Sequence, residues 1–154
     1  MEHDLAKIFS YDPSTGVVTW REGQRRAGRP LTTVQKKGGY IRTNVDRREY
    51  TAHQIAFYIM TGQVPEIIDH INGITSDNRW ANLRAASPAE NSRNRKAVRG
   101  LKGATLHKKT GKFQAQIKIG DKNHYLGLFD TEREANAAYA GAAKILFGEF
   151  ARAA

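Results

Sequence analysis

The sequence predicts an α+β fold, in which small antiparallel sheets and helices follow one another along the chain. Two extended segments flank Asp46-Arg47 as a hairpin, and an apolar helical pattern follows over 53–62. Residues 67–96 are typical of a strand, a long polar loop, a second strand and a helix. Residues 112–119 alternate between apolar and polar side chains, as a half-buried strand does. A chain of 154 residues can hold one ordinary domain or two or three very small ones.

The N-terminal part is expected to contain a hairpin and two helices. The segment YDPSTG is a turn by its Asp-Pro and glycine content, and Gly62 is placed to end the second helix. The basic, glycine-rich segment 21–38 indicates a loop. In chain order, the expected elements are a helix at 4–9, a strand at 17–20, strands at 39–45 and 48–53, and a helix at 53–62.

Helix-start signals mark the two later helices. Ser87 is followed by Pro88 and, three positions after Ser87, by Glu90, and Thr131 opens a second capping box of the same spacing. The helix expected over about 132–147 is rich in alanine, whose small side chain lets a sheet pack closely. The remaining expected elements are strands at 67–68, 83–85, 112–119 and 124–129, with a turn at 120–123.

Charge limits the classes of partner. The chain carries 25 Lys and Arg against 15 Asp and Glu, a net charge of +10. Residues 61–96 contribute only 5 basic and 4 acidic side chains, so the two flanks hold the excess. A small protein this basic usually binds a polyanion. Nucleic acid is the first candidate, and an anionic membrane surface is the second.

The absence of cysteine excludes disulfides, thiol catalysis and Cys-ligated zinc. No apolar run approaches the roughly 20 residues that cross a membrane. The N-terminus MEHDLAKIFS has acids before its short apolar stretch and does not resemble a secretory signal. We therefore expect a cytoplasmic protein.

The segment IDHINGITSDNRWANLRAASPAENSRN (68–94) contains residue types that could catalyse the hydrolysis of a phosphodiester, as a base or as metal ligands. A neutral histidine is the best side-chain base near pH 7, and a hard ion such as Mg²⁺ prefers oxygen ligands. Asp69 and His70 are adjacent at a strand end and would point to opposite sides of it. A second oxygen ligand could come from Asn91 or Asn94, one helical turn apart. The alternative is a surface ion pair beside asparagines that only cap turns, as Asn72, Asn78 and Asn94 are expected to do.

The spacing of these residues resembles the HNH endonuclease family, and more specifically its H-N-N variant from phage and intron-encoded homing endonucleases. Asn82 follows His70 by twelve positions and Asn91 follows it by twenty-one. The resemblance implies a ββα-metal motif with His70 as the general base that activates water. It also implies that Asp69 and Asn91 bind one divalent ion, Mg²⁺ or Mn²⁺, and that Asn82 holds the loop and His70 in place. His53 is assigned a helix-start or packing role.

Residues 100–150 resemble the plant APETALA/ethylene-response-factor DNA-binding domain, through KGA near the start, YLGLFDTEREANAAYA, and GEFA at the end. The resemblance implies a three-stranded antiparallel sheet that lies in the DNA major groove and is backed by one helix. Gln can pair with adenine edges, and Lys contacts phosphate or guanine. A solvated basic face is the alternative. The expected DNA-binding residues are Lys102, Lys108, Lys112, Gln114, Gln116, Lys118 and Tyr125, with Arg93 and Arg95 from the preceding helix.

Residues 1–62 resemble the leader that precedes this type of HNH motif, through YDPSTGVVTW, GGY and AHQIAF. Its basic residues could follow the phosphate backbone or only be solvated; they are Arg25, Arg26, Arg29, Lys36, Lys37, Arg47 and Arg48. The expected division of the chain is a hairpin and helix region at 1–62, a nuclease core at 63–96, a linker at 97–103 and a DNA-binding domain at 104–154.

Together these patterns predict a metal-dependent endonuclease of phage or mobile-element homing type that acts on double-stranded DNA. It would work as a monomer in the cytoplasm of a bacterial host cell, nicking one strand, or cutting both with two copies or two visits. A non-catalytic, sequence-specific DNA-binding regulator is the alternative. RNA binding is disfavoured because no aromatic stacking platform stands out.

Overall fold

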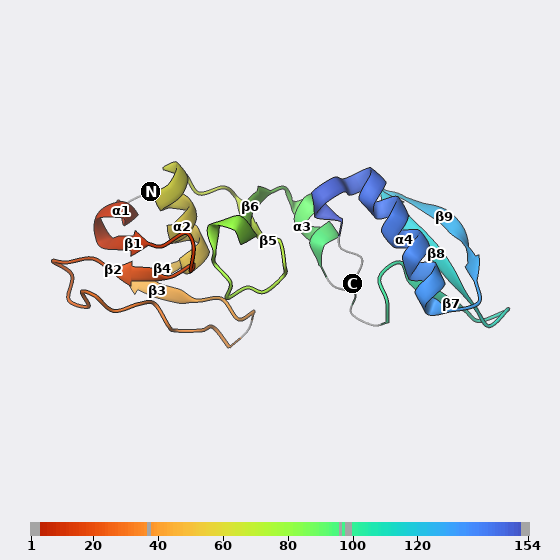
Figure 1. Ribbon diagram of the computed structural model, residues 1–154, viewed down its shortest axis with the longest axis horizontal. Helices are drawn as coiled ribbons and strands as arrows, with labels where there is room; N and C mark the ends of the chain where they lie inside the picture. The colour runs from red at the N-terminus through yellow and green to blue at the C-terminus, as the bar shows by residue number, and fades with distance from the viewer. Residues whose placement is uncertain (1–3, 37, 96, 98–99, 152–154) are drawn as a thin grey trace. The chain divides into compact units, whose positions relative to one another are not determined.

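The computed structural model describes residues 4–36, 38–95, 97 and 100–151 and divides the chain into two compact units, Met1–Ser87 and Pro88–Ala154 (Figure 1). Small antiparallel sheets and separate helices confirm the predicted α+β class. The division falls inside the segment expected to form the nuclease core, so helix α3 (Pro88–Asn94) belongs to the second unit. Lys37 and part of the expected linker, residues 98–99, lie outside the described residues.

The first unit consists of short antiparallel strand pairs around one longer helix. Strand β1 departs from prediction, because Phe9 to Tyr11 leave the short helix and pair with β2. The elements are α1 (Leu5–Ile8), β1 (Phe9–Tyr11), β2 (Val18–Trp20), β3 (Arg42–Val45), β4 (Arg48–Thr51), α2 (Ala52–Thr61), β5 (Ile67–His70), the 3₁₀ helix η1 (Trp80–Asn82) and β6 (Leu83–Ala86). The pairs are β1–β2, β3–β4 and β5–β6.

Local chemistry explains the hairpin and the helix that follows it. Asp46 and Arg47 have φ values of 46° and 67°, the left-handed pair that matches the twist of a two-residue hairpin. Thr51 and Gln54 form a capping box at the start of α2, and Gly62 ends the helix with φ 77°. The predicted hairpin and helix are both confirmed.

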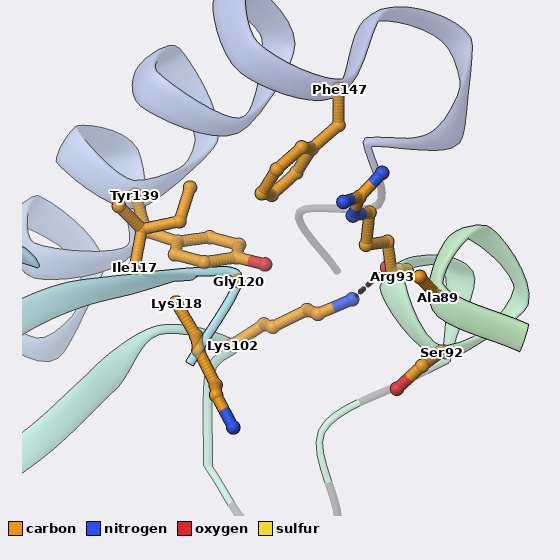
Figure 2. A pocket seen from close by; sticks show the side chains of 9 residues that line it. All are labelled: Ala89, Ser92, Arg93, Lys102, Ile117, Lys118, Gly120, Tyr139 and Phe147. Carbon is orange, nitrogen blue, oxygen red and sulfur yellow. Dashed lines mark hydrogen bonds between the residues drawn. The ribbon is translucent and has the colours of Figure 1, made fainter. Parts of the chain in front are cut away.

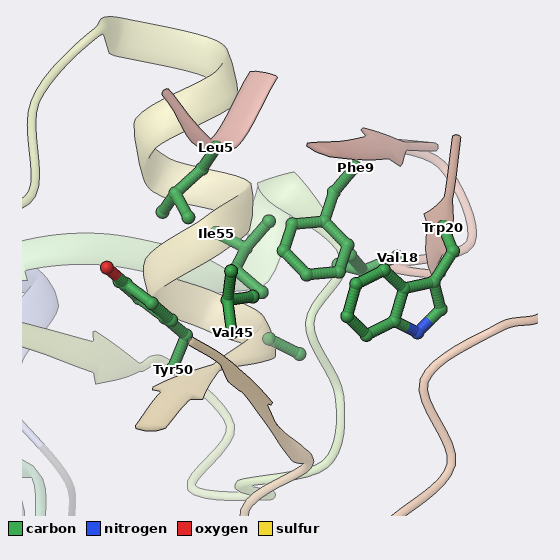
Figure 3. Close-up of a cluster of buried hydrophobic side chains, with 8 residues drawn as sticks. Leu5, Phe9, Val18, Trp20, Val45, Tyr50 and Ile55 are labelled. Carbon is green, nitrogen blue, oxygen red and sulfur yellow. The ribbon is translucent and has the colours of Figure 1, made fainter. Parts of the chain in front are cut away.

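The core of the first unit lies between α2 and the strands (Figure 3). Phe9 and Trp20, cross-strand partners in β1 and β2, pack with ring centroids 4.5 Å apart. The buried members of the cluster are Leu5, Phe9, Val18, Trp20, Val45, Tyr50, Ala52 and Ile55. Burying a side chain of this size contributes about 1.5–3 kcal/mol of stability. The short elements α1 and β1 are therefore stabilised mainly by packing.

The second unit places one helix beside a three-stranded antiparallel sheet, as expected. Its further elements are β7 (Ala104–His107), β8 (Lys112–Ile119), β9 (Lys122–Phe129), α4 (Glu132–Phe147) and the 3₁₀ helix η2 (Gly148–Phe150). The strand order is β7-β8-β9. The predicted capping box is present, since the Glu134 amide donates to Thr131 Oγ1 and the Thr131 amide donates to Glu134 Oε2.

Small side chains bring α4 close to the sheet. Ala115 of β8 and Ala143 of α4 are fully buried, together with Ile117. Gly103 has φ 77°, and a Cβ there would lie 2.1 Å from Tyr139 Cγ, so the ring requires glycine. Ile119, expected on the buried face, is 37% exposed because it is the last residue of β8 beside the turn.

Within the described residues, no helix has both the length and the apolar character that crossing a bilayer requires.

Candidate active site

Asp69 and His70 form the end of β5 and lie opposite β6. In the antiparallel register Asp69 pairs with Arg84 and His70 with Leu83. Asp69 and His70 are each only 4% exposed, and consecutive strand residues point to opposite faces. Each side chain therefore has its own surroundings, and neither lies at the surface, as the alternative of a surface ion pair requires.

Arg84 fixes the carboxylate of Asp69. Its Nε and Nη2 donate to Asp69 Oδ2 at 2.9 and 2.7 Å, and both side chains are buried. Breaking a buried pair of this kind leaves an uncompensated charge and costs about 3–5 kcal/mol. Arg84 was not among the predicted site residues. The signal for it lies in the strand register, because a buried acid needs a partner and the position opposite supplies one.

Asn82 closes the loop between β5 and β6. Its Nδ2 donates to the Asp77 carbonyl at 2.7 Å, and its Oδ1 accepts from the Asn72 amide at 2.9 Å. Its own carbonyl accepts from the Ile71 amide at 2.9 Å. Hydrogen bonds from Arg79 and Asn72 hold the pKa of Asp77 well below its usual range. Asn82 therefore stabilises the loop that follows His70, through hydrogen bonds to both ends of it.

Asn78 orients the imidazole of His70. Asn78 Oδ1 lies 3.1 Å from His70 Nε2, while Asn78 Nδ2 donates to the Ser76 carbonyl. Because the amide oxygen can only accept, Nε2 carries the proton and the lone pair lies on Nδ1. Burial lowers the pKa of His70, against smaller opposing effects of Asn78, Asp69 and Asp77. His70 is therefore neutral near pH 7, the form that a general base requires.

The turn YDPSTG, distant in sequence, supports Asn78. The Tyr11 hydroxyl donates to the Asn78 carbonyl at 2.7 Å, and burial raises the pKa of Tyr11 to about 12, so the donor keeps its proton. A Cβ on Gly16 would lie 2.5 Å from the Arg79 amide nitrogen, so glycine lets this turn approach the loop. Asn78 does more than cap a turn, and sequence reasoning missed it because its supports come from residues far away along the chain.

Two further rings pack around His70. The His53 ring lies 5.2 Å from it, nearly perpendicular, and Tyr40 lies 5.1 Å from His53 and 6.0 Å from His70. His53 Nε2 is 3.1 Å from Thr51 Oγ1, and its buried Nδ1 has no hydrogen-bond partner among the described residues. Burial, and secondarily His70, lowers the pKa of His53 to about 3. His53 lies in the first turn of α2, one residue after the helix begins, and its ring also packs against the candidate base His70.

Both predicted metal donors carry oxygen. Asp69 offers a carboxylate in the first unit, and Asn91 offers an amide oxygen on α3 of the second unit. Among the described residues, no group of three or more His, Cys, Asp or Glu side chains could hold a metal. The pairing of Asp69 with Asn91 as metal ligands therefore stays a prediction.

The sheet of the second unit brings three predicted DNA-binding residues to one face. Gln116 pairs across the strands with Tyr125, which is 64% exposed, and Gln114 lies two positions before Gln116. The alternate residues Ala115 and Ile117 are buried on the other face. Lys108 and Lys118 are exposed in the turn after β7 and near the end of β8. Lys118 also has an acidic neighbour, because its Nζ lies 4.0 Å from Asp121 Oδ1.

Three other predicted DNA-binding residues, Lys112, Lys102 and Arg93, have partners within the second unit. Lys112 Nζ lies 2.8 Å from Asp130 Oδ1. Lys102 Nζ donates to the carbonyls of Arg93 and Arg95, at the end of α3, and the Arg93 guanidinium lies 4.3 Å from the Phe147 ring centroid (Figure 2). These contacts surround a hollow of about 370 Å³. Lys102 and Arg93 therefore help to hold α3, and their part in DNA binding stays a prediction.

Residues 50–93 match the protein family described as HNH endonuclease. The matched segment is less than a third of the chain. It contains Asp69, His70, Asn82 and Asn91 at the spacing that predicted the match, and it also contains His53 and Asn78. The matched segment begins in β4 and ends in α3, so its last residues lie in the second unit.

Similarity extends to longer proteins. The AP2-like ethylene-responsive transcription factors AIL7 and AIL6 of Arabidopsis thaliana are 33% and 32% identical over 128 residues, covering 77% of this chain and 24% and 20% of their own lengths. The uncharacterized HNH endonuclease L560 of Acanthamoeba polyphaga mimivirus is 30% identical over 118 residues, covering 75% of this chain and 62% of that protein. The chain thus spans less than two thirds of these curated relatives, and no solved structure matches it.

Proposed function

We propose that this protein is a divalent-metal-dependent endonuclease that hydrolyses phosphodiester bonds in double-stranded DNA. The observation that carries the proposal is His70, which is buried, neutral and oriented by Asn78 inside the segment that matches the HNH endonuclease family. Burying a polar ring costs free energy unless its hydrogen bonds are satisfied. A non-catalytic regulator, the alternative function, has no use for a buried base beside a fixed carboxylate.

In the proposed reaction, His70 Nδ1 takes a proton from a water molecule as the water oxygen bonds to phosphorus. The bond between phosphorus and the 3′ oxygen breaks, which leaves a 5′-phosphate and, after protonation, a 3′-hydroxyl. Asn78 keeps the imidazole in the required tautomer, and Asn82 holds the loop that follows His70. Arg84 orients the carboxylate of Asp69.

Asp69 and Asn91 would hold one Mg²⁺ or Mn²⁺ ion, which would neutralise charge on the phosphate and the departing oxygen. Carboxylate and amide oxygens are the hard donors that such ions prefer. The assignment is supported by the oxygen-only donor set and by the HNH spacing of Asp69, His70 and Asn91.

DNA binding would use the outer face of the second unit's sheet. Gln114, Gln116 and Tyr125 would contact base edges, while Lys108 and Lys118 would contact phosphates. The net charge of +10 and the partial similarity to two plant transcription factors support this part of the proposal. A monomeric homing enzyme of phage or mobile-element type, in a bacterial cytoplasm, rests on the sequence resemblance.

The proposal is tested on supercoiled plasmid with Mg²⁺ or Mn²⁺. Wild type should convert the plasmid to nicked or linear form, and His70→Ala should cut at least about 100-fold more slowly, since a positioned base contributes 10²–10⁴-fold. His124→Ala, at an exposed histidine of the second unit, should cut like wild type. A wild type that binds DNA but leaves several plasmids intact with both metals would favour the regulator.

A further inference from the structure

The segment 21–31 of the first unit is an ordered loop that folds back on β2. The Gly28 amide donates to the Trp20 carbonyl at 2.9 Å, and the Leu31 amide donates to the Val18 carbonyl at 2.8 Å. In the reverse direction, the Trp20 amide donates to the Arg29 carbonyl at 3.1 Å. The side chains of this segment therefore extend from a fixed backbone, unlike those of a solvated basic tail.

Arginine side chains of this loop surround a hollow of about 370 Å³. Trp20 forms part of its wall, and the Arg26 guanidinium lies 6.0 Å from the Trp20 ring. Thr32 and Thr33 add hydroxyl groups to the lining. The complete lining is Trp20, Arg25, Arg26, Arg29, Pro30, Leu31, Thr32, Thr33, Arg42 and Thr43, which includes four arginines and no acidic residue.

In the part of the chain that the structure describes, three of these arginines have no acidic partner. Arg42 is paired with Glu49 of the neighbouring strand. Within the described residues, the structure gives no carboxylate partner to Arg25, Arg26 or Arg29, and all three are exposed. Guanidinium groups gathered on one loop repel each other, and a bound anion would remove that repulsion.

We propose that this hollow, the arginine hollow, binds the phosphate backbone of double-stranded DNA. A guanidinium fork matches phosphate oxygens, and the threonine hydroxyls can donate to them as well. The mainly polar, basic lining favours contact with the DNA phosphate backbone over contact with particular bases. The inference rests on the proposed function for its choice of DNA. It adds a contact site in the first unit, separate from the sheet face of the second unit.

The test measures binding without cleavage. Fluorescence anisotropy of a labelled duplex of about 30 base pairs is followed in EDTA against KCl concentration, using the full chain. Each phosphate contact contributes about 0.9 to the slope of log affinity against log salt, so Arg25→Gln/Arg26→Gln/Arg29→Gln should reduce the slope by about 2 to 3. Each single substitution should reduce it by about 0.9, which keeps the test valid if the triple variant is unstable.

A matched control removes the same charge elsewhere. Lys7→Gln/Arg133→Gln/Lys144→Gln replaces three exposed cations outside the hollow, so both triple variants fall from +10 to +7, three charges fewer. The proposal is overturned if this control loses as much slope as the hollow variant, or if the hollow variant loses none. Slope loss confined to the hollow variant supports the arginine hollow even when wild type fails to cut plasmid, so the two proposals fail separately.

Discussion

The candidate active site and the sheet face of the second unit use polar side chains in opposite ways. Asp69, His70, Asn78 and Asn82 are buried and bonded to their own loop and strands. On the sheet, Tyr125 is exposed to solvent and Gln114 and Gln116 are partly exposed. Buried polar groups need internal partners, which fix their positions, whereas exposed groups can exchange water for DNA. The first arrangement suits chemistry that depends on exact placement, and the second suits a surface that must adapt to its partner.

The largest expected effect is at Gly16, where the YDPSTG turn contacts the loop that carries Asn78. Gly16→Ala places a Cβ 2.5 Å from a backbone nitrogen at φ 78° and should cost about 3 kcal/mol of stability. Gly23→Ala has φ 85° with no atom within 4 Å, so only backbone strain of about 1 kcal/mol should appear. Urea unfolding followed by tryptophan fluorescence reports on this unit, which holds both Trp20 and Trp80. Equal costs would show that the turn does not support the loop.

The second prediction concerns Asn78, which touches His70 and no proposed metal donor in the described contacts. Asn78→Leu should slow plasmid cleavage by about 10- to 100-fold, because the imidazole loses the bond that fixes its tautomer. DNA affinity measured in EDTA should remain within about twofold of wild type. Asn123→Leu, at an exposed position in β9, serves as the control for cleavage. Unchanged cleavage by Asn78→Leu would mean that burial alone orients His70.

The third prediction is a loss of stability in acid. The pKa of His53 is about 3 in the folded protein, against the ordinary histidine value of 6.5, so the unfolded chain binds more protons between those two pH values. Stability should therefore rise with pH across this window, and lowering the pH from 7 to 5 should cost about 2 kcal/mol. The lowered pKa of His70 acts in the same direction. His53→Phe should have a shallower pH dependence in urea unfolding, and an unchanged dependence would contradict the prediction.

The smallest effects separate two lysines of the second unit. Lys118→Gln should lower the salt slope of DNA binding by about 1, as loss of one phosphate contact does. Lys102→Gln should leave that slope unchanged and destabilise the unit by about 1 kcal/mol, because its ammonium binds carbonyls at the end of α3. Circular dichroism melting supplies the stability measurement. A slope change at Lys102 equal to that at Lys118 would return Lys102 to the DNA-binding face.

Sequence patterns were sufficient wherever a local rule dictated the structure. The Asp46-Arg47 turn, the alternation in β8 and the Thr131 capping box each follow from neighbouring residues, and all three were predicted. The pair Asp69-His70 was proposed from residue types at a strand end, and the loop asparagine Asn82 was proposed from the resemblance to HNH endonucleases. These features depend on contacts between residues close in sequence or on a pattern fixed along one element.

The contacts that sequence analysis missed join distant segments. Asn78 depends on Tyr11, which lies 67 positions away, and Arg84 becomes a partner of Asp69 only through the strand register. His53 resembled an ordinary helix-start residue, and its contact with His70 requires α2 and β5 to be packed together. Which polar residues are buried side by side is decided by tertiary packing, which no local pattern encodes.

The attachment of α3 to the second unit has a consequence for how such nucleases could exchange parts. Lys102 and Phe147 hold the helix that carries Asn91. Recombination at residue 97, just after the nuclease core expected from sequence, would separate this helix from the side chains that hold it. Recombination between Ser87 and Pro88 would move Asn91 together with an incoming module. In this protein the boundary between two exchangeable modules would therefore lie within the HNH motif and not after it.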